Sequence, residues 1–140
     1  MEPIASRNQT MLRGSLLELP AFSHENHGKR FFRFFLEVPR LSGAVDILPV
    51  IAEQTALRAM DPFGGGLLTV TGQVRSHNIR EGGRRRLSVF VFASDVIAED
   101  GEPINTVRLD GAVCREPTYR RTPLGREICD VMLAVPRAFH

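Results

Sequence analysis

Hydrophobic and polar residues alternate along much of the chain with the two-residue period that is typical of β-strands. Between Phe31 and Val38 every even-numbered position is apolar, so these side chains would share one buried face, while Arg33, Phe35 and Glu37 would lie on the other face. Four more segments have strand-like patterns, and they are Thr10–Leu17, Val45–Ala52, Leu67–Arg75 and Leu87–Val96. The pattern therefore predicts five strands and an all-β fold.

The segments between these strands are rich in polar residues, glycine and proline, as is typical of turns and loops. Leu19–Arg30 and Ser76–Arg86 are predicted to be loops, and Arg40–Gly43 is predicted to be a turn. Glu53–Met60 is predicted to form one short helix, which the proline and glycines of Asp61–Gly66 would end. A short helix between the third and fourth of five strands is the order of an OB-fold barrel.

Three single residues inside the predicted strands add detail to this barrel. Gly14 and Gly72 lie within the first and fourth strands, where glycine permits the sharp bends of a small closed barrel. Pro49 lies within the third strand and predicts an edge position or a bulge, because proline has no N–H to donate to a neighbouring strand.

The beginning of the chain repeats near its end. A shift of 97 positions places residues 8–40 on residues 105–137 with nine identities in 33 positions, where ordinary composition would give about two by chance. Phe22 falls on Tyr119 as a similar pair. We therefore interpret residues 1–100 as an OB-fold domain, and residues 101–140 as a C-terminal β-hairpin, the first two strands of a second, incomplete OB-fold repeat. We therefore expect either that the protein continues past His140 or that a partner completes this hairpin.

Composition and charge restrict the classes of function. The 140 residues are 43% hydrophobic and 24% charged, as in soluble globular proteins, and no apolar run is long enough to span a membrane. The two cysteines, Cys114 and Cys129, lack metal-ligand spacing, which favours reduced thiols in a cytoplasmic protein. Positive charge is concentrated in two segments, because residues 75–86 contain five arginines and one glutamate, and residues 114–126 contain four and one. An anionic partner would bind there.

No residue constellation predicts catalysis or a cofactor. Phe63–Leu68 contains glycines without the following lysine of a phosphate-binding loop. His24 and His27 are spaced like metal ligands but lack two further ligands, so a solvated loop is the better interpretation. The protein is therefore predicted not to be an enzyme, to need no cofactor and to hold no metal.

Several motifs resemble the bacterial single-stranded DNA-binding proteins and their primosomal replication relatives. The C-terminal stretch NTVRLDGAVCREPTYRRTPLGREICDVMLAV is similar to the opening of that family, with its N-x-V-x-L-x-G strand, T-P-x-G turn and second strand ending in L-A-V. In the first copy, DILP at Asp46–Pro49 and LLTVTGQVRSHNI at Leu67–Ile79 are similar to the family's third and fourth strands.

This resemblance implies a non-catalytic protein of DNA replication, repair or recombination, which binds single-stranded DNA by placing arginines on the backbone and a few aromatic rings under bases. The first copy departs from the family pattern, because Ile47, Glu53 and Ile79 occupy positions where the family often has aromatic residues. We therefore predict limited stacking. The candidate DNA-binding residues are Arg33, Phe35, Arg75, His77, Arg80, Arg84, Arg85, Arg86, Arg115, Tyr119, Arg120, Arg121 and Arg126.

A second interpretation is an OB-fold scaffold for oligomer assembly or protein partners, with little affinity for DNA. The outward apolar row Ile47, Pro49 and Ile51 favours it, since exposed apolar rows mark interfaces. Either interpretation predicts a homodimer or homotetramer, because a lone hairpin leaves unpaired edges. The resemblance also implies replication or primosome proteins as partners and a cytoplasmic, nucleoid-associated location.

Overall fold

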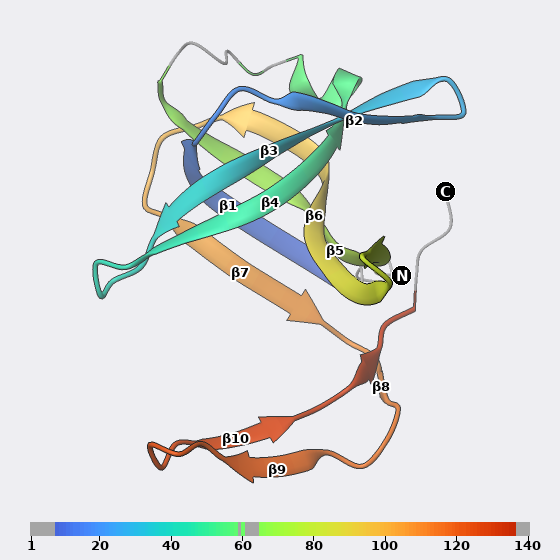
Figure 1. Ribbon diagram of the computed structural model, residues 1–140. Helices are drawn as coiled ribbons and strands as arrows, with labels where there is room; N and C mark the ends of the chain where they lie inside the picture. Colours follow the sequence, from blue (N-terminus) through green and yellow to red (C-terminus); the bar gives the residue numbers. More distant parts are fainter. Residues whose placement is uncertain (1–7, 59, 61–64, 137–140) are drawn as a thin grey trace, which may run out of the picture. The chain divides into compact units, whose positions relative to one another are not determined.

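The computed structural model describes residues 8–58, 60 and 65–136, and it divides the chain into two compact units (Figure 1). The larger unit is Gln9–Val107, and the described part of the smaller one is Asn8 with residues 108–136. No helix in these ranges is long and apolar enough to cross a membrane.

Five strands of the larger unit close into a ring in the order β1, β3, β4, β6, β5 and back to β1 (Figure 1). The β4–β6 pair is parallel and every other pair in the ring is antiparallel, which confirms the predicted five-stranded OB-fold barrel. A further strand, β7, pairs with β1 outside the ring. The bounds are β1 Asn8–Leu16, β3 Lys29–Pro39, β4 Val45–Glu53, β5 Leu67–Glu81, β6 Arg84–Ala98 and β7 Ile104–Leu109.

Two glycines allow the ring to close. A Cβ on Gly14 would lie 2.3 Å from the carbonyl oxygen of Glu37, at the point where β1 leaves β5 and meets β3. A Cβ on Gly72 would lie 2.2 Å from the carbonyl oxygen of Phe92, beside the β-bulge at which Ser94 donates to the carbonyl of Thr71. Both glycines therefore have the role that the sequence predicts.

The inward side chains of the ring form one hydrophobic core. Phe34, Leu36 and Val38 of β3 are at most 2% exposed, which confirms the predicted alternation, while Phe32 is half-buried. They pack with the buried residues Leu12, Val50, Ala52, Met60, Leu68, Val70, Val91, Ala93 and Val96. Pro49 is compatible with its strand because β4 pairs with β6 only from Val50 to Ala52, so its missing N–H is not needed there.

Two segments predicted to be loops are paired strands that extend beyond the barrel. β2 (Ala21–Asn26) pairs with the start of β3 through a turn at His27 and Gly28, which both have positive φ, and we call this hairpin the β2–β3 arm. β5 and β6 remain paired as far as Glu81 and Arg84, so the second loop is reduced to a glycine turn at the tip of a β5–β6 arm. Both faces of each arm are largely exposed, and such strands lack the alternating burial pattern that sequence reasoning uses.

The predicted helix Glu53–Met60 is present only as a single 3-10 turn, η1 (Gln54–Leu57), between β4 and β5. Residue 59 and residues 61–64, with most of the predicted glycine-rich turn, lie outside the described residues.

The smaller unit repeats the start of the barrel with the same register. β8 (Ala112–Val113) pairs with β11 (Leu133–Ala134), and β9 (Thr118–Arg121) pairs with β10 (Glu127–Asp130). Under the shift of 97, the cross-strand pair of Ala112 and Ala134 corresponds to that of Ser15 and Glu37. The pair of Tyr119 and Cys129 corresponds in the same way to that of Phe22 and Phe32.

The close backbone approach is repeated as well. A Cβ on Gly111 would lie 2.2 Å from the carbonyl oxygen of Ala134, as Gly14 approaches Glu37. The hairpin is therefore built like β1–β3 of the barrel.

Candidate nucleic-acid interface

One side of the barrel carries aromatic and basic residues from β3, β5 and β6, and we call it the outer face. Strand register places Phe31, Arg33 and Phe35 of β3 on this face, opposite to the buried Phe34 and Leu36. β4 contributes Ile51 between β3 and β6, and the other members are Phe90 and Phe92 of β6 and Gln73, Arg75 and His77 of β5. The outer face lies between the two arms, where OB-folds commonly bind oligonucleotides.

A continuous row of planar groups crosses the outer face. The imidazole of His24 on β2 stacks on Phe31 with ring centroids 4.7 Å apart and planes inclined by 10°. Phe31 contacts Phe92 at 5.8 Å, and the guanidinium carbon of Arg75 lies 4.1 Å from the centroid of Phe92. We call these four residues the planar row.

A second planar pair adjoins the row on the β5–β6 arm. His77 meets Phe90 edge to face with ring centroids 5.5 Å apart. Phe90 is half-buried and His77 is exposed, so the imidazole is accessible to a ligand. His77 is one of the candidate DNA-binding residues predicted from the sequence, whereas Phe90 is not.

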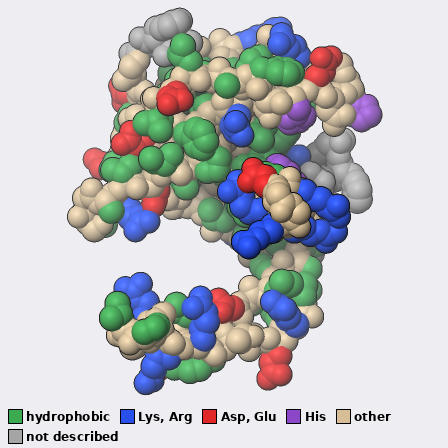
Figure 2. Space-filling model, in the orientation of Figure 1, with side chains coloured by type: hydrophobic (Ala, Val, Ile, Leu, Met, Phe, Trp, Pro, Cys, Tyr) green, Lys and Arg blue, Asp and Glu red, His purple; other side chains and the backbone are tan. Residues whose placement is uncertain are grey.

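The arginines of the β5–β6 arm lie on two opposite faces. The register pairs Ile79 with Arg86 and Glu81 with Arg84, which continues the outer face outward from Arg75 and His77. Arg80 and Arg85 form the cross-strand pair between these two pairs. Their side chains therefore point to the opposite face of this arm, which also carries Leu87 and Val89. Figure 2 shows basic side chains gathered around the tip of this arm. The predicted arginine cluster is thus divided, and only Arg84 and Arg86 share a face with the planar row.

Other predicted residues of the first copy differ in accessibility. Arg33 is exposed beside Ile51, and Phe35 is half-buried opposite Pro49. The predicted outward apolar row is not uniformly exposed, because Ile47 is 54% exposed while Ile51 is only 7% exposed. Ile51 is covered because β3 and β6 flank it, with Arg33 and Phe92 at the same level.

In the smaller unit, carboxylates engage several of the predicted basic and aromatic residues. The hydroxyl of Tyr119 donates to Glu127 Oε1 at 2.8 Å, and Arg121 donates to the same oxygen at 3.0 Å. The bonds from Tyr119 and Arg121 hold the pKa of Glu127 below its usual range. Arg120 pairs with Asp130 at 2.7 Å. Arg115 and Arg126 form no ion pair in residues 108–136.

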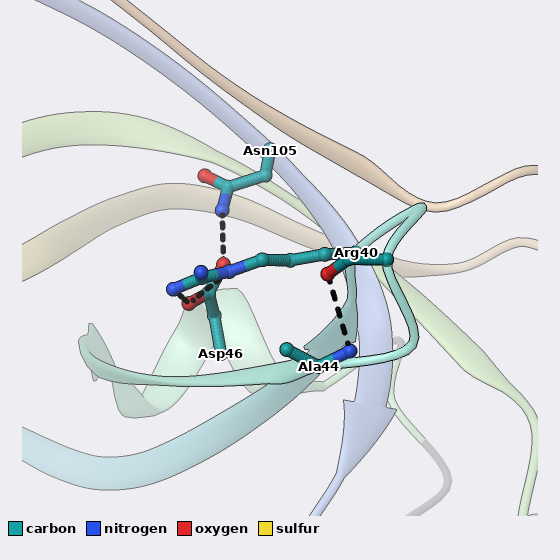
Figure 3. A network of polar contacts seen from close by, with 5 residues as sticks. Arg40, Ala44, Asp46 and Asn105 are labelled. Atoms are coloured by element: carbon teal, nitrogen blue, oxygen red, sulfur yellow. Dashed lines mark hydrogen bonds and ion pairs between the residues drawn. The ribbon is translucent and has the colours of Figure 1, made fainter.

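A polar network attaches β7 to the barrel (Figure 3). Asp46 accepts hydrogen bonds from Arg40 Nε at 2.9 Å and from the side-chain amide of Asn105 at 3.3 Å. The hydrogen bond from Arg40 is the main reason that the pKa of Asp46 lies below its usual range. The backbone N–H of Arg40 also donates to the carbonyl oxygen of Ala44 at 2.7 Å, which closes the β3–β4 turn. The start of β7 is therefore also bonded to the first residues of β4.

The described residues contain no group of three potential metal ligands. Cys114 and Cys129 are free and exposed, and they are not cross-strand partners of each other. The register explains this, because Cys129 pairs with Tyr119 while the Cys114 N–H donates to the carbonyl of Met132.

Sequence reasoning missed three members of the planar row, which are His24, Phe31 and Phe92. His24 was assigned to a loop because the pairing of β2 with β3 has no apolar pattern. The alternation of phenylalanine with valine over residues 89–92 is a signal that could have placed Phe90 and Phe92 on one outward face. The expected loss of most of the aromatic platform was therefore based on an incomplete set of residues.

Comparisons with known proteins assign this barrel to the OB-folds and then to a family. The structure is similar to the dimeric N-terminal domain of PriB from Thermoanaerobacter tencongensis, with 35% sequence identity and a TM-score of 0.57, over 67% of this chain and 98% of that one. The chain belongs to the OB-fold family that contains PriB and the bacterial single-stranded DNA-binding proteins. Neither family models nor curated protein sequences give a match.

Two more distant structures share the fold. The single-stranded DNA-binding protein of Thermus aquaticus has a TM-score of 0.73 and 24% identity, over 92% of this chain and 68% of that one. The Plasmodium falciparum single-stranded DNA-binding protein, in complex with single-stranded DNA, has a TM-score of 0.57 and 18% identity, over 71% of this chain and 100% of that one.

Proposed function

We propose that this protein is a non-catalytic single-stranded DNA-binding protein that acts in DNA replication, repair or recombination. The observation that carries the proposal is the planar row, His24–Phe31–Phe92–Arg75, which crosses the outer face between two arms of an OB-fold barrel. Aromatic rings and guanidinium planes stack on any base, and each stack contributes about 1–3 kcal/mol. Arg33, Arg84 and Arg86 lie on the same face and would bind phosphates.

The row has two kinds of accessible surface. Phe31 is 9% exposed because His24 covers it, and Phe92 is half-buried under Arg75. Bases would therefore stack on the imidazole and the guanidinium at the two ends of the row, while the two phenylalanines support these groups from below. Such binding depends little on sequence, because every base has a flat π surface.

A titration with labelled oligo(dT) at several salt concentrations tests the proposal. We expect the logarithm of the affinity to fall steeply with the logarithm of the salt concentration, because phosphate contacts release counterions. The absence of binding at micromolar protein and low salt would reject the proposal. Double-stranded DNA of the same length is the control and should bind more weakly, because its bases are not free to stack.

We also propose that the protein forms homo-oligomers and works with replication or primosome proteins. The related PriB domain is dimeric, and the chain exposes several large apolar side chains, including Val45, Ile47 and Met132. Light scattering at tens of micromolar protein would contradict self-association if it gave the monomer mass.

The second candidate function, an OB-fold scaffold with little DNA affinity, is favoured by the exposure of Val45 and Ile47 on β4, where β6 no longer pairs with that strand. The same oligo(dT) titration distinguishes it, since a scaffold would self-associate without binding the oligonucleotide.

A further inference from the structure

The β2–β3 arm carries a second aromatic cluster on the face opposite to His24 and Phe31. Phe22 and Phe32 are direct cross-strand partners, and their rings meet edge to face with centroids 5.9 Å apart. The guanidinium carbon of Arg30 lies 4.9 Å from the centroid of Phe22 and 5.6 Å from that of Phe32. We call these three residues the reverse-face cluster.

Two properties of this cluster are those of a ligand site. The ring of Phe22 is 52% exposed, so a large planar apolar surface faces water. Among the described residues, Arg30 forms no ion pair, and Glu25, which is directly opposite on β2, does not pair with it. The two rings hold the guanidinium in place while its N–H groups retain their capacity to bind an anion.

The smaller unit repeats the exposed aromatic of this cluster at the equivalent position, but its arginine lies at a different position. Under the shift of 97, Phe22 corresponds to Tyr119, which is 60% exposed, and Arg30 corresponds to Glu127. The cation beside Tyr119 is Arg121, which shares Glu127 with the tyrosine hydroxyl. An exposed aromatic ring with a neighbouring arginine is therefore present on the corresponding hairpin of both copies, although only the first copy leaves its arginine without a carboxylate partner.

We propose that the reverse-face cluster is a second binding site for single-stranded nucleic acid, in which Phe22 stacks on one base and Arg30 binds an adjacent phosphate. This inference rests on the proposed function. The two faces of the arm meet at β2, which is the terminal strand of the sheet order and has no neighbour on its other side among the described residues. A nucleic-acid chain bound at His24 need only cross the width of β2 to reach Phe22. The nucleic acid would therefore bend around the arm.

The absence of tryptophan from the sequence provides a specific test. Phe22→Trp introduces a single indole at the site, and Leu41→Trp introduces one in the β3–β4 turn, where the side chain is fully exposed. Each variant is titrated with fluorescein-labelled oligo(dT) of about 30 nucleotides, long enough to extend beyond one OB-fold site. Fluorescence anisotropy of the label reports binding, and tryptophan emission from a second titration with unlabelled oligonucleotide reports stacking.

We expect the tryptophan emission of Phe22→Trp to be quenched as the oligonucleotide binds, and that of Leu41→Trp to be unchanged. Phe22→Ala should weaken the binding of this oligonucleotide about 5- to 150-fold, the effect of losing one stacked base. Unchanged emission from Phe22→Trp at saturation, with normal anisotropy, would overturn the second site but leave the proposed function intact. No anisotropy change in any variant or in the wild type would overturn both. A change in oligomer mass in Phe22→Ala, with no loss of DNA affinity, would instead assign the cluster to contact between copies and overturn the proposal.

Discussion

The guanidinium of Arg75 lies over the ring of Phe92, with its central carbon 4.1 Å from the ring centroid. Arg75 Nη2 also donates to Gln73 at 3.3 Å, so two contacts orient the side chain across the outer face. A stacked guanidinium can support a base and neutralise a phosphate at once, and these two contributions are separable by mutation.

Arg75→Lys should reduce the affinity for oligo(dT) about tenfold, because lysine keeps the charge but loses the planar stack. The salt dependence should be unchanged in Arg75→Lys and lower by about 0.7 in Arg75→Ala, the slope expected for one phosphate contact with a single strand. Anisotropy titrations over a range of salt concentrations measure both quantities. Wild-type affinity in Arg75→Lys, with a loss only in Arg75→Ala, would show that Arg75 contributes only charge.

The division of arginines on the β5–β6 arm predicts different effects for two matched pairs. Arg84→Ala with Arg86→Ala removes two charges from the outer face and should lower the salt slope by about 1.4. Arg80→Ala with Arg85→Ala removes the same charge from the reverse face of the same arm and should change the slope much less. The same decrease in both double variants would contradict a face-specific role.

Gly72→Ala should destabilise the barrel by about 1–3 kcal/mol, because its Cβ would lie 2.2 Å from a backbone carbonyl oxygen that cannot move without breaking the bulge. Gly66→Ala is the control, since its Cβ would have only an ordinary contact with Asp100 at 3.7 Å. Urea denaturation of the two variants measures the free energy of unfolding. Equal stability of both would show that β6 adjusts around position 72.

We expect the contribution of Asp46 to stability to depend on pH. Its folded pKa is lowered, chiefly by the hydrogen bond from Arg40, so its contribution to stability is present above its unfolded pKa of about 4 and is lost as pH falls through the lower folded value. Asp46→Asn should therefore be less stable than wild type at neutral pH, and the difference should shrink in acid. Urea midpoints across this pH range test the expectation, and a constant difference would contradict it.

The ion pairs of the smaller unit predict which of its arginines contact DNA. Arg115→Ala with Arg126→Ala should lower the salt slope more than Arg120→Ala with Arg121→Ala, because Arg120 and Arg121 already pair with Asp130 and Glu127. Anisotropy titrations of the two double variants provide the comparison. The reverse order would show that DNA displaces the carboxylates, which is feasible because exposed ion pairs are weak.

Much of the barrel could be predicted because its signals are local or repeat in the sequence. The buried face of Phe34, Leu36 and Val38 has a two-residue period, and Gly14 marks the closure point. The shift of 97 predicts even the register of the smaller unit, where Tyr119 pairs with Cys129 as Phe22 pairs with Phe32.

The candidate site was less predictable because it depends on neighbours that are distant in the chain. Phe31 and Phe92 meet only because β4 lies between β3 and β6 and pairs with β6 in parallel. Neither face of the β5–β6 arm is buried, so its strands lack hydrophobic alternation. For this reason the sequence predicts a loop at Ser76–Arg86. Without the strand register, nothing in the sequence divides Arg84 and Arg86 from Arg80 and Arg85.

The pairing of β7 with β1 has a consequence for the behaviour of the protein at high concentration. One edge of β1 pairs with β5, and the other edge pairs with β3 only near the end of β1. The rest of that second edge pairs with β7 of the same chain. An uncovered strand edge can pair with strands of other molecules and so start aggregation. A strand of the same chain protects the edge because its tether gives it a high effective concentration there. Arg13 secures the tether through hydrogen bonds to Thr69 at 2.9 Å and to the carbonyl of Glu102 at 3.3 Å. Loss of this arginine would favour exchange of β7 between molecules, and with it domain-swapped assemblies.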